Sequence, residues 1–266
     1  MARMPYTWRQ PPYPGDDSDK RWIDPSMIIL CEDGDINAAI GPLLDTLYEP
    51  IGTGLIAAVF VHETLREQFI EKVRGEMTVM HRQVKKHDFY KKALRRLDCL
   101  GAETVAMMQP DDIGFQYTMV EGSPIVVCDF SQSYFSINHP STVVTLHTFR
   151  HSQELGELTA KEHLPFVSAA IWCPKMSAAY EIALLLNVPA VYINCAGISL
   201  MPIVEKHRNN QSFALLLADH HYEVLVIRGR AKAIVFPAPL PLLKRPEPPS
   251  PESPSGQKPL RKNSKS

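Results

Sequence analysis

A tight turn and a set of scattered thiols and imidazoles are the features of this sequence that could do chemistry. The turn is Gly52-Thr53-Gly54, which lies between a helical pattern and a buried apolar run. Enzymes with alternating helices and strands often place a reactive side chain in such a turn, where a nucleophile can form a covalent intermediate. Here the strongest nucleophile available is the hydroxyl of Thr53. The turn therefore has the sequence of a catalytic loop without a catalytic side chain.

The histidines predict no metal site. His147 and His151 are four residues apart, but one ends an apparent strand and the other lies in the turn after it, so they need not share a face. His220 and His221 are adjacent and should diverge. A zinc site needs several His, Cys or carboxylate ligands at matched spacing, and none accompanies these residues. We expect scattered surface histidines.

The cysteines predict reduced, mostly buried thiols. Five are spread along the chain without a C-x-x-C pair, which is typical of a cytoplasmic protein. Cys195 is a conceivable substitute nucleophile, but it ends an apolar strand with no activating partner in the sequence. A serine-hydrolase Gly-x-Ser-x-Gly motif and a phosphate-binding P-loop are both missing from the sequence.

Helical and strand patterns alternate between residues 25 and 236, and this predicts an α/β fold with a mostly parallel, open sheet flanked by helices. The strand at 169–173, the helix at 175–187 and the strand at 190–195 form a βαβ unit, so its two strands should be parallel. A further β segment is expected over 222–236. Other apolar runs typical of buried parallel strands are 27–31, 55–63, 123–130 and 142–149.

Two helix boundaries are predicted by their end residues. Asp33 or Asp35 should cap the helix whose apolar stripe begins at Ile36. Gly101 should end the helix that begins near His87, whose inward face we expect to include Phe89, Ala93, Leu94 and Leu97.

Composition divides the 266 residues into three parts and excludes several classes of partner. The composition predicts a polar, Pro-rich arm over residues 1–24 and a folded domain over residues 25–236. It predicts a disordered Pro/Ser/Lys-rich tail over residues 237–266. Ser250 and Ser253 precede prolines, so the tail is either a docking or phosphorylation segment or a solubilising one. A net charge of −1 predicts neither nucleic acid nor an anionic membrane as a partner. Without a signal-peptide pattern or an apolar run near the roughly 20 residues of a membrane span, a cytoplasmic location is expected.

Several segments, in order, resemble the catalytic-domain half of the aldehyde dehydrogenase superfamily. MIILCEDGDINAAI resembles that family's apolar strand, Glu-Asp-Ala-Asp and helix, and LIAAVFVHETLREQFIEKV is similar to the strand and helix after its catalytic cysteine. PFVSAAIWCPKMSAAYEIALLLNVPAVYINC aligns without a gap to its substrate-side βαβ unit, and YEVLVIRGR resembles its C-terminal oligomerisation strand. The resemblance covers roughly residues 25–236. It implies that family's α/β fold and oxidation of an aldehyde with NAD(P).

Position by position, the resemblance implies that the catalytic groups have been lost. The family's cysteine nucleophile falls on Gly54, and its general-base glutamate falls in a stretch that offers only Asp19 as a weak substitute. Asn138 and Pro140 stand where the family's Glu and Phe hold the nicotinamide ribose. Asn194 matches the family's asparagine near the substrate, although an asparagine at a strand end can equally satisfy local backbone groups.

We therefore expect a truncated, degenerate aldehyde-dehydrogenase-like protein, a pseudoenzyme with vestigial positions Gly54, Asn138 and Asn194 and no cofactor or metal. The late β strand implies an oligomer, either with itself or with a full-length aldehyde-dehydrogenase-like subunit, because we expect that strand to lack its hairpin partner. One alternative is an NAD(P)-dependent oxidoreductase acting on an aldehyde or semialdehyde. A weaker one is a small-molecule pocket around Gly54 and Asn194.

Overall fold

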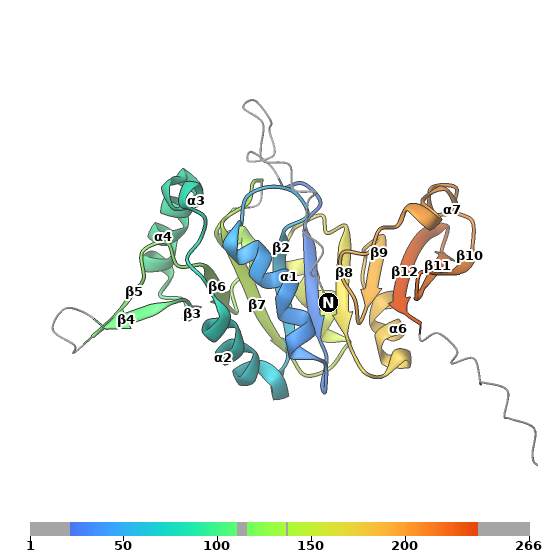
Figure 1. The fold of residues 1–266 in the computed structure, drawn as a ribbon, viewed down its shortest axis with the longest axis horizontal. Helices are drawn as coiled ribbons and strands as arrows, with labels where there is room; N and C mark the ends of the chain where they lie inside the picture. Colours follow the sequence, from blue (N-terminus) through green and yellow to red (C-terminus); the bar gives the residue numbers. More distant parts are fainter. Residues whose placement is uncertain (1–21, 111–115, 137, 239–266) are drawn as a thin grey trace, which may run out of the picture.

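The computed structural model describes residues 22–110, 116–136 and 138–238. A ten-stranded sheet runs through these residues in the order β10-β11-β12-β9-β8-β1-β2-β7-β6-β3 (Figure 1). Its strands are β1 (Ser26–Leu30), β2 (Ile56–His62), β3 (Thr104–Val105), β6 (Ile125–Cys128), β7 (Val143–Phe149), β8 (Ser168–Trp172), β9 (Ala190–Ile193), β10 (Phe213–Leu217), β11 (His220–Ile227) and β12 (Arg230–Pro237). A separate two-stranded ribbon is formed by β4 (Met108–Pro110) and β5 (Tyr117–Met119).

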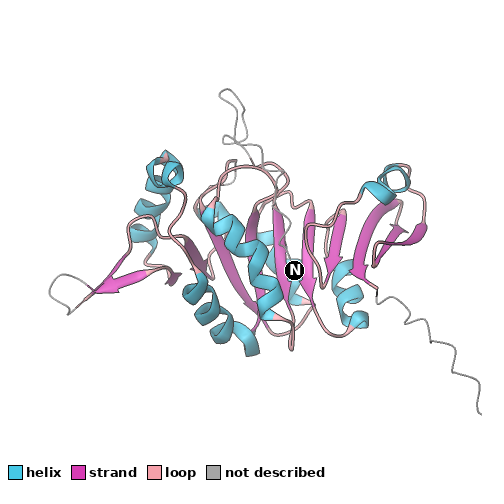
Figure 2. Ribbon diagram, viewed as in Figure 1, coloured by secondary structure: helices cyan, strands magenta, loops and turns pink. Residues whose placement is uncertain are grey.

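The centre of the sheet is parallel and is covered by helices on both faces (Figure 2). On one face, α1 and α2 pack against alternate residues of β1 and β2, such as Ile28 and Val59. On the other face, α5 and α6 cover the intervening residues, such as Ile29 and Phe60. This two-sided burial explains why the central strands read as continuous apolar runs. The helices are α1 (Ile36–Tyr48), α2 (Arg66–Glu76), α3 (Arg82–Lys86), α4 (Asp88–Leu100), α5 (Glu154–Lys161), α6 (Met176–Leu185) and α7 (Val204–Arg208), with 3-10 turns at Glu63–Leu65, Gln132–Tyr134 and Met201–Ile203.

The α/β fold and most of its predicted elements are confirmed. β8 and β9 are parallel neighbours joined through α6, as the βαβ pattern requires. Asp35 is the N-cap of α1 and accepts a hydrogen bond from the backbone N–H of Ala38 at 3.1 Å. Gly101 ends α4 in the left-handed conformation at φ 60°, where a glycine avoids the clash of a Cβ.

The buried face of α4 is rotated slightly from the predicted one. Tyr90, Ala93 and Leu97 are its buried residues, whereas Phe89 is only half-buried and stacks on His139 with 3.9 Å between ring centroids. Tyr90 takes the inner position because its hydroxyl donates a hydrogen bond to the Ser123 carbonyl at 3.1 Å. An aromatic ring with a polar tip can be buried when that tip finds a partner.

The prediction that the late β strand lacks a hairpin partner is wrong. β11, which contains the YEVLVIRG sequence, pairs antiparallel with β12 on one side and with β10 on the other. The sequence pattern did not reveal β10, whose FALLL residues follow a polar segment. Among the strands in the described residues, β10 and not β11 is therefore the last one at this end of the sheet and forms its open edge.

The arm and the tail expected at the two ends of the chain lie outside the described residues, apart from 22–24 and 237–238. Asp19, Ser250 and Ser253 fall in the same outlying parts. Within the described start, Ile23 forms an isolated parallel bridge with Thr53, and Trp22 packs against the core on the α6 face. The folded part therefore includes residues that composition alone assigned to the arm.

Candidate functional site

The Gly52-Thr53-Gly54 turn lies at the amino end of β2 and borders a cavity of about 520 Å³. The backbone N–H of Gly54 donates to the Ile23 carbonyl at 2.9 Å, which ties the turn to the segment before β1. Gly52 and Gly54 have φ values of 132° and 64°, which L residues adopt only with strain. A Cβ added at either position would meet no atom within 4 Å. The glycines are therefore needed for the backbone conformation and not for lack of space.

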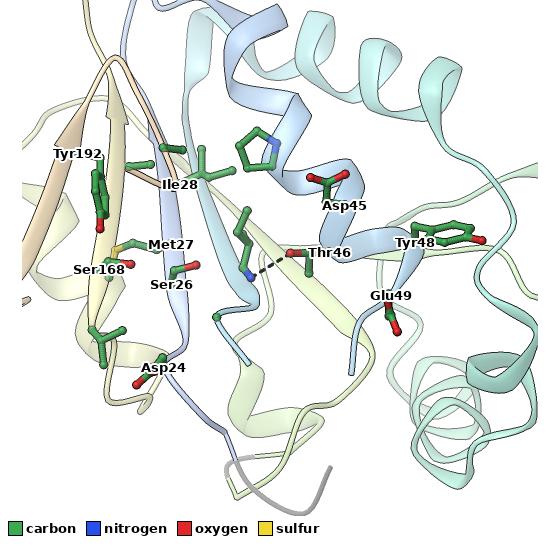
Figure 3. Close-up of a pocket in the computed structure, with 17 residues that line it drawn as sticks. Asp24, Ser26, Met27, Ile28, Asp45, Thr46, Tyr48, Glu49, Ser168 and Tyr192 are labelled. Carbon is green, nitrogen blue, oxygen red and sulfur yellow. Dashed lines mark hydrogen bonds between the residues drawn. The ribbon is translucent and has the colours of Figure 1, made fainter. Parts of the chain in front are cut away.

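The walls of the cavity come from α1 and from the amino-terminal parts of β1, β2 and β8 (Figure 3). Thr46 of α1 accepts a hydrogen bond from the backbone N–H of Ile56 at 3.2 Å, which fixes the helix to the start of β2. Ser26 donates its hydroxyl hydrogen to the Leu55 carbonyl at 3.2 Å. Both hydroxyls are therefore engaged with the backbone, and neither is paired with a base that could activate it.

The ionisable groups around the cavity are acidic or phenolic. Asp24, Asp45 and Glu49 contribute carboxyl groups, and Tyr192 contributes a phenol from β9. Burial raises the pKa of Tyr192 to about 12, and the nearby Cys195 and Tyr222 act in the same direction. Among the described residues that line this cavity there is no Cys, His, Lys or Arg. Such a lining can accept hydrogen bonds or attract a cation, but it offers neither a thiolate nor a positive group for a phosphate.

The three positions that the resemblance singled out, Gly54, Asn138 and Asn194, do not come together. Gly54 borders the cavity, whereas the exposed Asn138 contributes a backbone carbonyl that accepts from the Trp22 N–H at 3.2 Å. Asn194 lies beyond the carboxyl end of β9 and bonds the backbone of Cys173 with both ends of its side-chain amide. Its side chain thus satisfies backbone groups at the end of the neighbouring strand β8, 21 residues away in the sequence. Asn194 is not among the residues that line the Gly54 cavity.

Cys195 lies two residues beyond β9, and its thiol contacts the Val235 carbonyl at 3.5 Å. Burial raises its pKa to about 12, so this thiol is a weak nucleophile at neutral pH. All five cysteines are free. In the described parts of the chain, no three His, Cys, Asp or Glu side chains are grouped closely enough to hold a metal ion.

Sequence reasoning missed a buried polar network, none of whose residues lines the Gly54 cavity. His147, expected at the surface, is buried on β7 and bonds the fully buried Glu162. Glu162 also accepts from the backbone N–H of Gln132 at 2.7 Å and from the Thr145 hydroxyl at 2.9 Å. His147 and Glu162 are 15 residues apart, and Glu162 follows an amphipathic helix where an exposed acid is the usual expectation. No spacing in the sequence could have paired them.

None of the helices in the described residues is long and apolar enough to cross a bilayer.

Comparison with known proteins gives one family match and a set of similar solved structures. Residues 21–240 match the family described as "Protein of unknown function (DUF1487)". No curated protein matches the sequence.

Among solved structures, the chain is similar to an NAD-dependent benzaldehyde dehydrogenase from Corynebacterium glutamicum, at 18% identity and a TM-score of 0.48 over 68% of this chain and 41% of that one. It is also similar to an NAD-dependent aldehyde dehydrogenase from Sinorhizobium meliloti, at 16% identity and a TM-score of 0.49 over 67% and 38%. A betaine aldehyde dehydrogenase from Staphylococcus aureus gives 18% identity and a TM-score of 0.49 over 65% and 38%. All three are aldehyde dehydrogenases, the family that the sequence motifs resemble. The chain spans about 40% of the length of these structures.

Proposed function

The chain belongs to the family described as "Protein of unknown function (DUF1487)", and we propose that it is a non-catalytic, aldehyde-dehydrogenase-like protein. In this proposal it acts in the cytoplasm by association with itself or with a full-length aldehyde-dehydrogenase-like subunit. The observation that supports it best is Gly54, which borders the cavity at the position where the family motif would place the nucleophile.

The charge of the cavity supports the absence of cofactor chemistry. A dinucleotide carries a pyrophosphate, which proteins bind with backbone N–H groups at a helix start or with Lys and Arg. Asp24 and Asp45 would instead bring negative charge to the same space. No Lys or Arg stands among the described residues that line the cavity, so NAD(P) binding at this site would be electrostatically unfavourable.

The open edge at β10 supports association. Edge strands present unpaired backbone groups to another chain, and natural proteins often protect them with lysine or proline. β10 has neither within Phe213–Leu217, and its Leu216 and Leu217 side chains are 53% and 48% exposed. An added strand would bond the β10 backbone and cover these leucines. This edge replaces β11 as the strand that we expect to reach a partner.

The first experiment is a titration of the purified chain with NADH and NADPH by calorimetry, followed by assays with short aldehydes and NAD(P). We expect neither binding nor turnover. Clear binding in the micromolar range together with turnover would overturn the non-catalytic assignment and favour the alternative of an NAD(P)-dependent oxidoreductase.

The second experiment measures mass in solution by light scattering over a range of concentrations, alone and mixed with a full-length aldehyde dehydrogenase. We expect a self-associated or mixed species that the double substitution Leu216→Lys/Leu217→Lys disrupts. Leu184→Lys is the matched control, because Leu184 is an equally exposed leucine on a helix, where no strand can be added. A monomer under every condition would contradict the proposal.

A further inference from the structure

Two cysteines lie side by side where β1 and β8 end. The two strands are parallel, with Leu30 opposite Trp172 in the register, so Cys31 and Cys173 follow as the next opposed pair. The backbone N–H of Cys31 donates to the Trp172 carbonyl at 3.0 Å, which continues the ladder beyond the strands. Neighbouring strands are about 4.8 Å apart. That spacing falls within the Cα separation of about 4.4–6.8 Å that a disulfide can span.

Both thiols point to the same face of the sheet. Side chains alternate along a strand, and the two cysteines join the core on the face covered by α6, as do their alternate neighbours Met27, Ile29, Ala169 and Ile171. Cys31 and Cys173 are therefore neighbours on this face, and each thiol shifts the pKa of the other. Because the strand spacing suits a disulfide, a bond between the two sulfurs would need little movement of the backbone.

Asn194 holds one member of the pair in place. Its Oδ1 accepts from the Cys173 backbone N–H at 2.8 Å, and its Nδ2 donates to the Cys173 carbonyl at 2.9 Å. Asn194 itself adopts φ 53°, a left-handed conformation that asparagine tolerates better than most residues. It is a positioning residue for Cys173, because its hydrogen bonds go to the backbone of Cys173, whereas the Cys173 thiol donates to the Lys175 carbonyl at 3.4 Å.

The surroundings favour the thiolate at Cys173. The hydrogen bond from Cys31 lowers the pKa of Cys173 to about 6 against the opposing effect of burial, and the backbone and charge of Lys175 lower it further. The same contact raises the pKa of Cys31. Burial raises the pKa of Cys128 to about 11 and that of Cys195 to about 12. Cys173 is thus the best candidate for a nucleophilic sulfur, and Cys31 is placed to attack it afterwards.

We propose that Cys31 and Cys173 form an oxidisable dithiol, a modification site at which a small hydroperoxide is reduced and an intramolecular disulfide is formed. The Cys173 thiolate attacks one oxygen of hydrogen peroxide, the O–O bond breaks, and the departing hydroxide takes a proton to become water. The sulfenic acid left on Cys173 then condenses with the Cys31 thiol, which forms the S–S bond and releases a second water. The two sulfurs lose two electrons and the peroxide gains two.

The exposure of the pair fits a small oxidant. Cys31 is 7% exposed and Cys173 is 4% exposed, so a bulky disulfide could not reach either sulfur without opening the fold. The residues that follow each cysteine, Glu32–Asp33 and Pro174–Lys175, are exposed, so the pair lies next in sequence to the protein surface. Hydrogen peroxide is about the size of two water molecules and needs only a small opening of the fold.

The test oxidises the full, natively folded chain with equimolar hydrogen peroxide, blocks remaining thiols with N-ethylmaleimide in denaturant, and maps the peptides by mass spectrometry without reductant. We expect one cross-linked peptide pair, containing Cys31 and Cys173, which dithiothreitol releases. Cys99 is the control within the same chain, because it is an exposed cysteine outside the pair. A fully reduced pair beside an oxidised Cys99 would overturn the proposal, as would the same disulfide forming only in the unfolded chain.

Two variants test whether Cys31 attacks the sulfenic acid on Cys173 or only packs beside it. In Cys31→Ser we expect no disulfide and a sulfenic acid on Cys173 that dimedone traps. In Asn194→Ala we expect disulfide formation to slow by about tenfold while Cys99 reacts as before. Equal labelling of Cys173 by dimedone in wild type and Cys31→Ser would contradict the role of Cys31. The peptide map of the wild-type chain tests the formation of the Cys31–Cys173 disulfide directly, so this test does not depend on whether a variant folds.

Discussion

The two ends of the parallel sheet differ in what they offer a reaction. At the amino ends of β1, β2 and β8, the cavity beside Gly54 is lined by carboxyl and hydroxyl groups, and its turn holds two glycines at positive φ. At the carboxyl ends of β1 and β8, and just beyond β9, two cysteines lie next to the Asn194 amide. One end thus has a cavity without a thiol, and the other has a pair of thiols outside that cavity.

This difference teaches that loop geometry and reactivity are specified by separate residues. The Gly52–Gly54 turn depends on positive φ angles and on the bond from Gly54 to the Ile23 carbonyl, and neither needs a functional side chain. The thiol pair depends on strand register, which the apolar core fixes for its own reasons. The turn and the thiol pair can therefore be altered separately, because each depends on its own residues.

Removal of the buried acid near the amino ends should have the largest effect. Glu162 accepts hydrogen bonds from Gln132, Thr145 and His147, and Gln132 in turn donates to the carbonyls of Ala57 and Val143 at 2.7 and 2.8 Å. Glu162→Ala leaves these buried donors without a partner, which should lower the free energy of unfolding by about 3–5 kcal/mol.

Urea unfolding followed by circular dichroism measures the Glu162→Ala effect. Glu157→Ala, at an exposed position of the same helix, is the control and should change stability by less than about 0.5 kcal/mol. Glu162→Gln should fall between them, because one amide oxygen remains to accept. Equal stability of Glu162→Ala and the control would show that the network does not hold the amino ends of β2 and β7.

The helix that joins the two ends should depend on one lysine. α6 begins three residues after Cys173, and Lys232 of β12 donates its ammonium hydrogens to the Ala183 and Leu186 carbonyls at 2.5 Å each, at the other end of the helix. Lys232→Met keeps the aliphatic length but leaves these carbonyls without donors. We expect a loss of about 1.5–3 kcal/mol in urea unfolding.

Lys161→Met, at an exposed position, is the control for Lys232→Met. The oxidation rate of Cys173 in Lys232→Met tests whether the two ends of the sheet are coupled through α6. A ten-residue helix is about 15 Å long, so loosening its far end should change that rate by less than about twofold. A larger change would mean that the thiol pair is coupled to the amino end through α6.

The sequence predicted the central fold because the apolar periodicity of each element matches its burial. Residues 27–31, for example, are apolar throughout because both faces of β1 are covered. The Asp35 cap and the Gly101 terminus were predictable because each depends on the conformation of a single residue. β10 was missed because a five-residue strand at an edge buries too little to produce a clear pattern.

The candidate sites were less predictable because they depend on contacts across long separations. The position of Gly54 in a turn before β2 followed from local sequence, and the structure places it beside a cavity. The pairing of Cys31 with Cys173 spans the register of two strands, and nothing in the spacing of the five cysteines indicates it. The contact of His147 with Glu162 likewise needs the packing of α5 on β7.

The pH dependence of oxidation should separate the thiol pair from ordinary cysteines. Because the pKa of Cys173 is lowered to about 6, its thiolate predominates at pH 7.5 and should fall about tenfold by pH 5. The rate of peroxide-driven disulfide formation should follow that fraction and level off above pH 7. In the chain unfolded in guanidinium the rate should instead rise until about pH 8.5, the ordinary thiol range. A folded chain that follows the unfolded profile would contradict the activated state of Cys173.

The smallest effect on stability is expected when a cysteine replaces Gly54 in the Gly52–Gly54 turn. In Gly54→Cys, a Cβ at φ 64° should cost about 1–2 kcal/mol of stability, and it would meet no atom within 4 Å. Iodoacetamide should label the new thiol, because Gly54 is exposed at the edge of the cavity. Gly41→Cys, on the exposed face of α1, controls for a thiol added elsewhere. We expect no NAD(P)-dependent aldehyde oxidation from either variant, since the lining seen in the described residues offers no cation for the phosphates of the cofactor. Turnover in Gly54→Cys alone would show that the amino end lacks only its nucleophile, and that the contrast between the two ends rests on a single residue.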